Sequence, residues 1–196
     1  MTDPKDLEHT DPNPDPIPAQ PGRRNEDVAI RMIAYGGIFT ALVLLATWLL
    51  KIPLPVVGYI HLGDGIIFLS AVFLGPFAAV PAALGSGLAD FAAGFPVFIP
   101  ATVVIKGVMG LLSGVMLRRL GGKHVLPQIG VFLVAEIIMV AGYFGYEWIL
   151  YGINTAYPNI LYNTIQGIAG IVLGTVCIPA MRRIRNNMQA SSGSGD

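Results

Sequence analysis

The sequence predicts an all-α integral membrane protein with six transmembrane helices and both termini in the cytoplasm. Of its 196 residues, 54% are hydrophobic and only 12% are charged, whereas soluble domains usually carry about 25% charged residues. The mean hydropathy is +0.64. Residues 32–50 contain no charged side chain, and a helix of that length crosses about 30 Å of hydrocarbon. Basic residues gather outside the apolar runs, as they do on the cytoplasmic side of membranes.

The two ends of the chain differ from its apolar middle. Residues 1–29 hold six prolines and seven acidic residues, a composition that buries too little apolar surface to fold. We therefore expect a disordered cytoplasmic tail over residues 1–29, one membrane domain over residues 30–182 and a second cytoplasmic tail over residues 183–196.

Prolines and glycines divide the apolar middle into helices. The first is expected over residues 30–50, because the sequence KIPLPVVG that follows contains two prolines that cannot continue it. Pro100 suits a helix start, where its missing N–H costs nothing. The remaining helices are expected over residues 64–80, 81–94, 100–117, 127–150 and 158–181.

Residues 64–94 form either two short helices or one long one, and the basic residues help to decide. The basic clusters are Arg23, Arg24 and Arg31; Arg118, Arg119 and Lys123; and Arg182, Arg183 and Arg185. All three can be cytoplasmic only if an even number of crossings separates them. One long helix would leave three crossings between the first two clusters. Six crossings are the simplest reading, with a re-entrant hairpin as the alternative.

Most polar side chains within the apolar helices are expected at one depth. Ionisable residues inside a membrane cost about 2.5–3.5 kcal/mol each, so each is a functional candidate. With the six-helix topology, the outer half of the membrane holds Asp64, Asp90, Lys106, Glu147, Asn163 and Gln166. Glu136 is the exception, because it lies nearer the cytoplasmic half. Polar residues at a shared depth predict a ligand cavity that opens to the outside.

Helical spacing places these residues on shared faces. Glu136, Tyr143 and Glu147 lie on one face of the fifth helix. Asn159, Asn163, Gln166 and Gly170 lie on one face of the sixth. Tyr143 and Tyr162 would add aromatic walls. A pocket of aromatic rings, amides and a few charges suits a small planar heterocycle.

Each candidate also has a purely structural explanation. Asp64 suits a helix N-cap, and Asp90 with Lys106 would form a neutral pair inside the bundle. The two amides would join helices. Glu147 would be solvated near the interface, and His61 would lie in a wet loop. None of these explains why the residues share one side of the membrane.

The sequence lacks the motifs of several other functions. It contains no GxxxxGK[ST] phosphate loop, no HExxH and no GxSxG. Its single cysteine, Cys177, excludes an internal disulfide and a cysteine-based metal cluster. No catalytic residue, metal site or nucleic-acid partner is expected.

Small residues one turn apart mark three possible close helix contacts: Gly37 with Ala41, Gly110 with Gly114, and Gly170 with Gly174. Most are expected to pack within the chain. Gly37 and Ala41 lie on a peripheral helix, where they would dock another membrane subunit.

The sequences YIHLGDGIIFLSAVFLGPFAA and GLADFAAGFPVFIPATVVIKGVMGLLSG resemble the substrate-binding S components of energy-coupling factor (ECF) vitamin transporters. The resemblance continues through GYFGYEWILYG and YNTIQGIAG and covers about residues 29–181. It is greatest for the branch associated with riboflavin, hydroxymethylpyrimidine and pyridoxine. That branch more usually reads NLGD where this chain reads HLGD.

The resemblance implies a six-helix subunit of the cell membrane that captures a vitamin or vitamin precursor from outside. It implies a transmembrane coupling subunit and two cytoplasmic ATPases as partners, so that ATP is used by the partners and this chain carries no cofactor. Residues 52–63 would cover the site as a lid. His61 and Asp64 would lie where this lid meets the pocket, and Gly37 with Ala41 would dock the coupling subunit.

We expect Lys106, Glu147, Asn163 and Gln166 to contact the ligand. Asp90 would orient Lys106, and Tyr143 would stack on the ligand ring. Two rival functions use the same residues differently. One is an intramembrane enzyme with Glu136, Asp90 and Lys106, and the other is a solitary carrier in which Glu136 relays protons.

Overall fold

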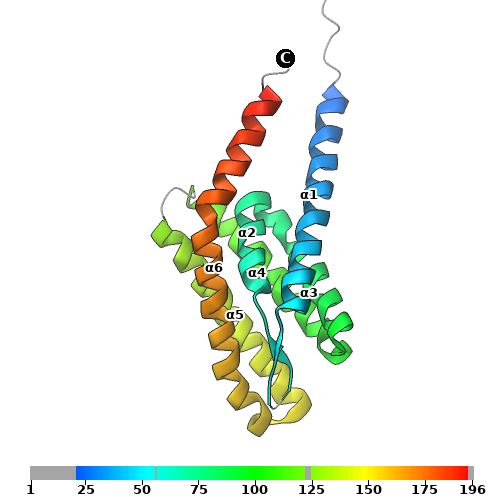
Figure 1. The fold of residues 1–196 in the computed structure, drawn as a ribbon, viewed down its shortest axis with the longest axis vertical. Coiled ribbons are helices and arrows are strands. Elements are labelled where there is room, and N and C mark those ends of the chain that lie inside the picture. The colour runs from blue at the N-terminus through cyan, green and yellow to red at the C-terminus, as the bar shows by residue number, and fades with distance from the viewer. Residues whose placement is uncertain (1–20, 56, 122–124, 194–196) are drawn as a thin grey trace, which may run out of the picture.

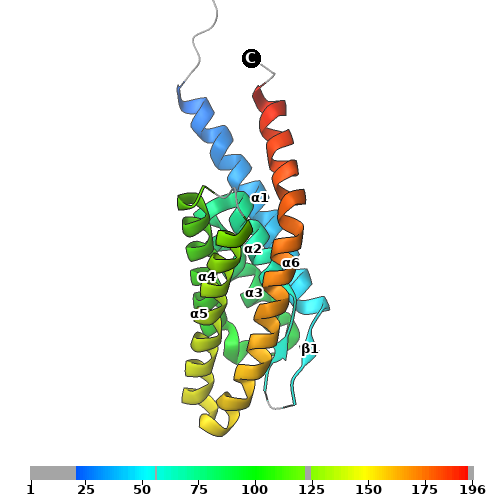
Figure 2. The same cartoon turned by 90° about the vertical axis from the view of Figure 1, so that its left-hand side faces the viewer.

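The computed structural model describes residues 21–55, 57–121 and 125–193. Within these ranges the chain forms an elongated bundle of α-helices with one short β-hairpin (Figures 1 and 2). The helices are α1 (Pro21–Leu49), α2 (Gly63–Leu74), α3 (Ala79–Ala93), α4 (Ile99–Arg119), α5 (Val125–Tyr151) and α6 (Ile153–Gly193). The predicted all-α class is therefore confirmed.

The chain between residues 63 and 93 folds back on itself. α2 ends at Leu74, and the 3-10 turn η2 (Gly75–Ala78) leads into α3. Gly75 has a φ of 64°, which glycine adopts without steric cost. At this turn the Arg118 side chain, near the end of α4, donates a hydrogen bond to the Leu74 carbonyl at 3.2 Å. A Cβ on Gly87, in the middle of α3, would lie 2.8 Å from Val103 near the start of α4, so α3 runs back along α4. α2 has Asp64 beside Lys106 and Leu74 beside Arg118, so it runs in the same direction as α4. α2 and α3 are therefore antiparallel.

The turn comes earlier than the sequence suggested. We expected the second helix to run to residue 80 and the third to begin at Pro81. Pro81 instead lies in the first turn of α3, where a missing N–H is tolerated. Gly75 and Pro76 make the turn, because neither favours a continuing helix.

Five helical segments of the described chain are long and apolar enough to cross a membrane. They are Val28–Leu49, Gly63–Ala93, Pro96–Arg119, Val125–Tyr151 and Ile153–Ile184. The second of these is the folded α2–α3 pair. Its arms of 12 and 15 residues are about 18 and 22 Å long at 1.5 Å per residue. Each arm alone is therefore shorter than the hydrocarbon layer.

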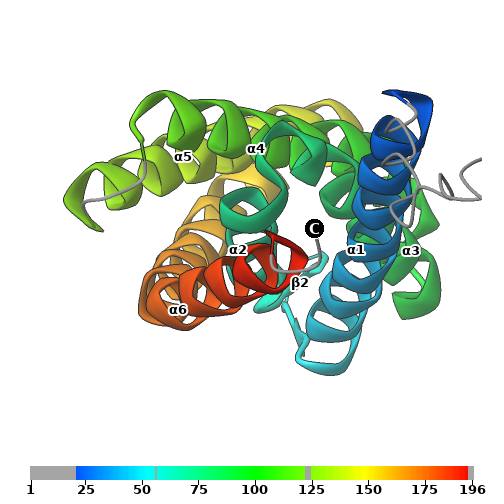
Figure 3. The same cartoon turned by 90° about the horizontal axis from the view of Figure 1, so that it is seen from above.

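α2 lies in the middle of the bundle, surrounded by the longer helices, whereas α1 lies at one edge against α3 (Figure 3). Apart from Asp64 and Ser70, the sequence of α2 is apolar around its whole circumference, and most of its residues are buried. A helix that is apolar on every side suits an enclosed position. The central helix therefore carries Asp64 into the interior.

Both outer helices extend beyond their apolar segments. α1 begins at Pro21 rather than at residue 30, and α6 continues to Gly193 rather than ending at residue 181. These parts of the expected tails are helical, and residues 1–20 lie outside the described chain. Apolar patterning detects where a helix meets lipid, but it does not detect a helix that continues into water. α6 also includes Pro158, which transmembrane helices tolerate.

The two ends of the bundle differ in chemistry. The start of α1, the end of α4 and the end of α6 lie at one end, which we call the basic end (Figures 1 and 2). Arg118 and Arg119 occupy the last turn of α4 there. The opposite end, which we call the cavity end, carries the hairpin of β1 (Ile52–Pro53) and β2 (Tyr59–Ile60). The hairpin pairs Ile52 with Ile60 and Pro53 with Tyr59 in antiparallel register.

Candidate substrate site

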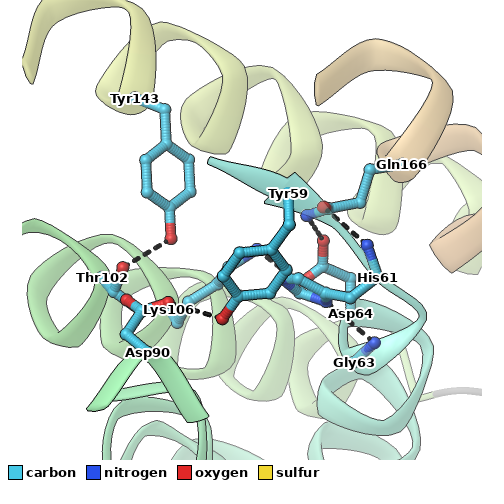
Figure 4. Close-up of polar contacts among 9 residues, drawn as sticks. All are labelled: Tyr59, His61, Gly63, Asp64, Asp90, Thr102, Lys106, Tyr143 and Gln166. Atoms are coloured by element: carbon cyan, nitrogen blue, oxygen red, sulfur yellow. Dashed lines mark hydrogen bonds and ion pairs between the residues drawn. The ribbon is translucent and has the colours of Figure 1, made fainter. Parts of the chain in front are cut away.

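Asp64 is the centre of a buried polar network at the cavity end (Figure 4). Its Oδ1 accepts a hydrogen bond from Lys106 Nζ at 2.5 Å, and its Oδ2 accepts one from Gln166 Nε2 at 2.7 Å. The Asp64 and Lys106 side chains are fully buried. Asp64 lies in the first turn of α2 but does not cap it, because Leu62 is the N-cap residue. The capping explanation is therefore wrong: the carboxylate joins three helices instead.

Lys106 is held by two kinds of contact. Besides its ion pair with Asp64, its Nζ lies 5.5 Å from the centre of the Tyr143 ring, within the range of a cation–π interaction. The Tyr143 hydroxyl and Thr102 Oγ1 are 2.9 Å apart and share a hydrogen bond. α4 and α5 are thereby joined beside the network.

The β-hairpin and the residue that follows it are joined to the helices by three hydrogen bonds, one with α3 and two with α6. The Tyr59 hydroxyl donates to Asp90 Oδ1 of α3 at 2.6 Å. The backbone N–H of His61 donates to Gln166 Oε1 of α6 at 3.2 Å. Asn159 Nδ2, also of α6, donates to the Val57 carbonyl at 3.1 Å. Residues 52–55 and 57–61 therefore cover the cavity end, and we call them the lid hairpin.

The two titratable lid residues have shifted pKa values. Burial, together with the charge of Asp90 and its hydrogen bond, raises the pKa of Tyr59, so its hydroxyl stays protonated and donates. Burial, and then the charge of Lys106, lowers the pKa of His61 from 6.5 to about 4, although Asp64 acts in the opposite direction. His61 is therefore neutral at pH 7. Its Nδ1 accepts the Gly63 N–H at 3.1 Å, which assigns the ring proton to Nε2.

A cavity of about 40 Å³ lies between the lid hairpin and the helices. Five of the seven predicted substrate-binding residues line it, together with His61: Asp90, Tyr143, Glu147, Asn163 and Gln166. Asp64 and Lys106 do not line it but contact residues that do. Ligand pockets usually measure about 300–1,000 Å³. A ring-sized ligand therefore needs the lid hairpin to move.

The cavity presents hydrogen-bond acceptors that nothing in the described chain satisfies. Asp90 Oδ2 and Glu147 Oε2 are buried without a hydrogen-bond partner, and both residues line the cavity. Buried polar atoms are normally paired, because an unpaired one costs about 1–3 kcal/mol. The site therefore offers acceptors to a ligand that carries N–H or O–H donors.

The structure corrects two expected roles. Asp90 was expected to orient Lys106, but Lys106 pairs with Asp64, and Asp90 accepts from Tyr59. Tyr162 was expected to form a wall, but it is not among the residues around the cavity. Spacing along a helix places a residue on a face but does not show which partner lies opposite.

Sequence reasoning missed Tyr59, Phe98 and Thr102, which also line the cavity. A signal for two of them was present. Phe98, Thr102 and Lys106 are spaced four residues apart, so they follow one face of a helix. Tyr59 comes from the lid hairpin, whose path the helical pattern does not predict.

The expected docking residues lie away from this site. Gly37 and Ala41 are exposed on α1, and a Cβ on Gly37 would have no atom of the described chain within 4 Å. The other two small-residue pairs pack within the chain. A Cβ on Gly114 would lie 2.1 Å from the Gly75 carbonyl oxygen, and one on Gly174 would lie 3.1 Å from Phe68.

Comparisons with known proteins agree with this arrangement. The family model described as "ECF-type riboflavin transporter, S component" matches residues 27–183. Over 159 residues the chain is 31% identical to the "Thiamine precursor transporter HmpT" of Lactococcus lactis subsp. cremoris (strain MG1363), covering 79% of this chain and 89% of that relative. Over 136 residues it is 33% identical to an "Uncharacterized protein in gap 3'region" of Pyrococcus woesei, covering 67% and 88%. The family match includes every residue that lines the cavity.

Proposed function

Because this chain belongs to the family of ECF-type riboflavin transporter S components, we propose that it is the substrate-capture subunit of an ECF-type importer. The family assignment makes it a multi-pass membrane protein of vitamin transport and not an enzyme. In the proposed function it binds a vitamin or vitamin precursor from outside for uptake driven by ATP. The observation that carries the proposal is the polar cavity under the lid hairpin, at the end opposite the arginines.

The proposed orientation has six crossings, with both termini in the cytoplasm of a cell whose cytoplasmic membrane holds the protein. The antiparallel α2–α3 pair supports this orientation, because it supplies the even number of crossings that the basic clusters require. The two arms are short, so the bilayer would thin locally or lipid headgroups would approach the η2 turn. The cavity end then faces outside.

The proposed ligand is a pyrimidine or pyridine alcohol. The unpaired Asp90 and Glu147 oxygens suit ring amino and hydroxyl groups, and the Tyr143 ring suits a planar heterocycle. Lys106 would act indirectly, by holding Asp64 and Gln166 in place. The relative named as a thiamine precursor transporter supports the same choice of ligand.

The proposed partners are a transmembrane coupling subunit and two cytoplasmic ATPases. This chain would contribute the binding site, and the partners would use the ATP. The exposed Gly37 and Ala41 support docking through α1, since close helix approach in lipid depends on small residues.

Co-purification from the native membrane tests the proposal. The tagged chain should bring a coupling subunit and two ATPases with it, and mass spectrometry should identify a small heterocycle released on denaturation. Uptake by vesicles should need ATP and should survive an ionophore that abolishes the proton gradient. Uptake by the chain alone that depends on the proton gradient would favour a solitary carrier instead.

The lid hairpin provides a second test. Saturating hydroxymethylpyrimidine should slow amide hydrogen exchange across residues 52–63, because a ligand beneath the hairpin opposes its opening. The α4–α5 turn at residues 119–121, at the basic end, serves as the internal control and should not change. Equal exchange in residues 52–63 with and without a bound ligand would count against a lid.

A further inference from the structure

A second hollow lies on the side of the bundle, between α5 and α6. It measures about 330 Å³, and we call it the α5–α6 groove. Its lining is mostly aliphatic and includes Leu133, Ile137, Ala141, Phe144, Ile168 and Ile171. Ile137 and Ile168 are 59% and 58% exposed, so the groove opens on the surface that faces lipid. It shares no lining residue with the cavity under the lid hairpin.

Glu136 is the one ionisable residue among those that line the groove. Its side chain is only 4% exposed, and neither carboxyl oxygen has a hydrogen-bond partner in the described chain. Two glycines of α6 make room for it. A Cβ on Gly167 would lie 3.0 Å from Glu136 Oε2, and one on Gly170 would lie 2.9 Å from Oε1. A mostly apolar hollow with one convergent polar group is typical of a small-molecule site.

The charged residues near Glu136 leave it without a cation. The same Cβ on Gly170 would lie 2.9 Å from the Cβ of Asp64, so Glu136 and Asp64 approach α6 at one glycine. Lys106 is the cation of this cluster, and it is bonded to Asp64. The ammonium of Lys106 is therefore taken up by Asp64, and Glu136 has no cation of its own in the described chain. A carboxyl group buried in this way stays protonated, and a ligand that brings a positive charge would let it ionise and pair.

The position of Glu136 limits the kind of cation. It lies 11 residues from the start of α5 and 15 from its end, or about 16 and 22 Å at 1.5 Å per residue. A phospholipid headgroup cannot reach that depth. An ammonium has three donors; Glu136 offers two acceptors, and Thr164 of the groove offers a third. The Thr164 hydroxyl proton is donated to the Ile160 carbonyl, which leaves the oxygen free to accept.

We propose that the α5–α6 groove binds a lipophilic primary amine, with its aliphatic chain along the groove and its ammonium on Glu136. This site is additional to the proposed substrate cavity and does not depend on it. Because Glu136 and Asp64 meet at Gly170, an amine bound in the groove lies next to the ion pair that supports the cavity.

Photolabelling in phosphatidylcholine nanodiscs tests the site. The probe is dodecylamine with a diazirine in its chain, and dodecanol and dodecanoate with the same diazirine are the comparison probes. The amine should label peptides of α5 and α6 around residues 133–144 and 160–171, and unlabelled dodecylamine should compete. Dodecanol should label more weakly, and dodecanoate should not label above background, because neither brings a cation that lets Glu136 ionise and an anion is also costly to bury beside it.

Two variants separate the ammonium contact from the groove itself. Glu136→Gln keeps the size of the side chain, removes its charge and should weaken competition by dodecylamine about tenfold or more. Ala141→Phe should fill the groove and abolish labelling. Ile149→Phe is the matched control, because Ile149 lies on the same helix, is 83% exposed and does not line the groove.

The control should label like the parent. Thermal unfolding and gel filtration of all three variants check that each is folded. Labelling that is equal for the amine and the alcohol, or unchanged in a folded Glu136→Gln, would show an ordinary lipid contact and overturn the proposal. Protection of the groove by a second copy of the chain or by a partner helix, with no amine labelling, would overturn it as well.

Discussion

The cavity end is polar and covered by the chain itself, whereas the exposed face of α1 carries small residues that the described chain leaves uncovered. At the cavity end, polar side chains from several helices bond to one another, and the lid hairpin covers them. On α1, Gly37 and Ala41 carry no polar side-chain atom, and the described chain places nothing over Gly37. A buried polar network is stable only when its hydrogen-bonding groups are paired. Small residues on a membrane helix contribute to stability only when another helix packs against them. Substitutions should therefore separate ligand binding from docking.

The largest effect is expected at Lys106. Lys106→Met keeps most of the side-chain volume but leaves Asp64 buried without its cation. Breaking a buried ion pair in this way costs about 3–5 kcal/mol of stability. We expect a lower melting temperature and a loss of ligand affinity of at least about 30-fold. Thermal unfolding and calorimetry with hydroxymethylpyrimidine measure the two effects.

A double variant distinguishes the ion pair from general damage. Asp64→Asn in the Lys106→Met background removes the stranded charge, so stability should recover by at least about 1 kcal/mol. Ligand affinity should stay low, because Gln166 would lose its acceptor carboxylate. Stability that falls further in the double variant would contradict this account of the network.

The next effect is expected at Ala41, on the other side of the comparison. Ala41→Trp should block close approach of a partner helix, because association in lipid depends on packing. We expect ATP-driven uptake and co-purification of the partner subunits to be lost, while ligand affinity stays within about twofold of the parent. Leu84→Trp is a control on α3, where Leu84 is 52% exposed. Normal transport by a folded Ala41→Trp protein would show that docking occurs elsewhere.

The contrast between the two regions also shows what sequence can predict. The all-α membrane class follows from apolar runs, because lipid imposes a uniform requirement on every helix that it surrounds. Residues 64–94 were correctly treated as the difficult segment, but the turn at Gly75 was placed too late. Six crossings and the cytoplasmic termini stay predictions, since only five segments of the described chain are long enough to cross and the sixth crossing depends on the short arms of the α2–α3 pair.

Individual pairs at the cavity end could not be predicted. The shared depth of Asp90, Glu147 and Gln166 was visible in the sequence, and these residues do line one cavity. The partner of Lys106 was not visible, because Asp64 and Asp90 lie on separate helices that both reach α4. In the structure Tyr59 of the lid hairpin donates to Asp90, and Lys106 pairs with Asp64.

A smaller effect is expected at Tyr59. Tyr59→Phe removes one hydrogen bond to Asp90, worth about 1.5–3 kcal/mol for a charged acceptor, but part of this is offset because Tyr59 is only half-buried. We expect ligand dissociation to become about three- to tenfold faster, since the lid hairpin opens more readily. Stopped-flow measurement of dissociation tests this.

Tyr146→Phe is the matched control for Tyr59→Phe. The Tyr146 hydroxyl donates to the Val97 carbonyl, outside the cavity, so ligand dissociation should not change. Equal rates in all three proteins would show that the Tyr59–Asp90 contact does not hold the lid hairpin.

The smallest effect is a pH dependence from His61. Its pKa is about 4 in the folded protein, below the ordinary histidine pKa of 6.5. Between these values the unfolded chain takes up a proton that the folded protein does not, so His61 lowers stability as pH falls from about 6.5 to 4 and has no pH effect above 6.5. The full shift corresponds to at most about 3 kcal/mol. Opening of the lid hairpin already exposes the His61 ring to water, so part of this free energy is released before the protein unfolds. We therefore expect His61 to change the free energy of global unfolding by about 1 kcal/mol.

His61→Asn isolates this contribution. The Asn carbonyl can accept the Gly63 N–H that His61 Nδ1 accepts now, and Asn does not titrate. Carboxyl groups remote from His61 titrate equally in both proteins, so they cancel in the comparison. Relative to the parent, His61→Asn should gain stability as pH falls from 6.5 to 5, measured by thermal unfolding at fixed ionic strength. If stability changes with pH in the same way in the two proteins, the His61 ring reaches water in the folded state. His61 would then not be buried between the lid hairpin and the cavity.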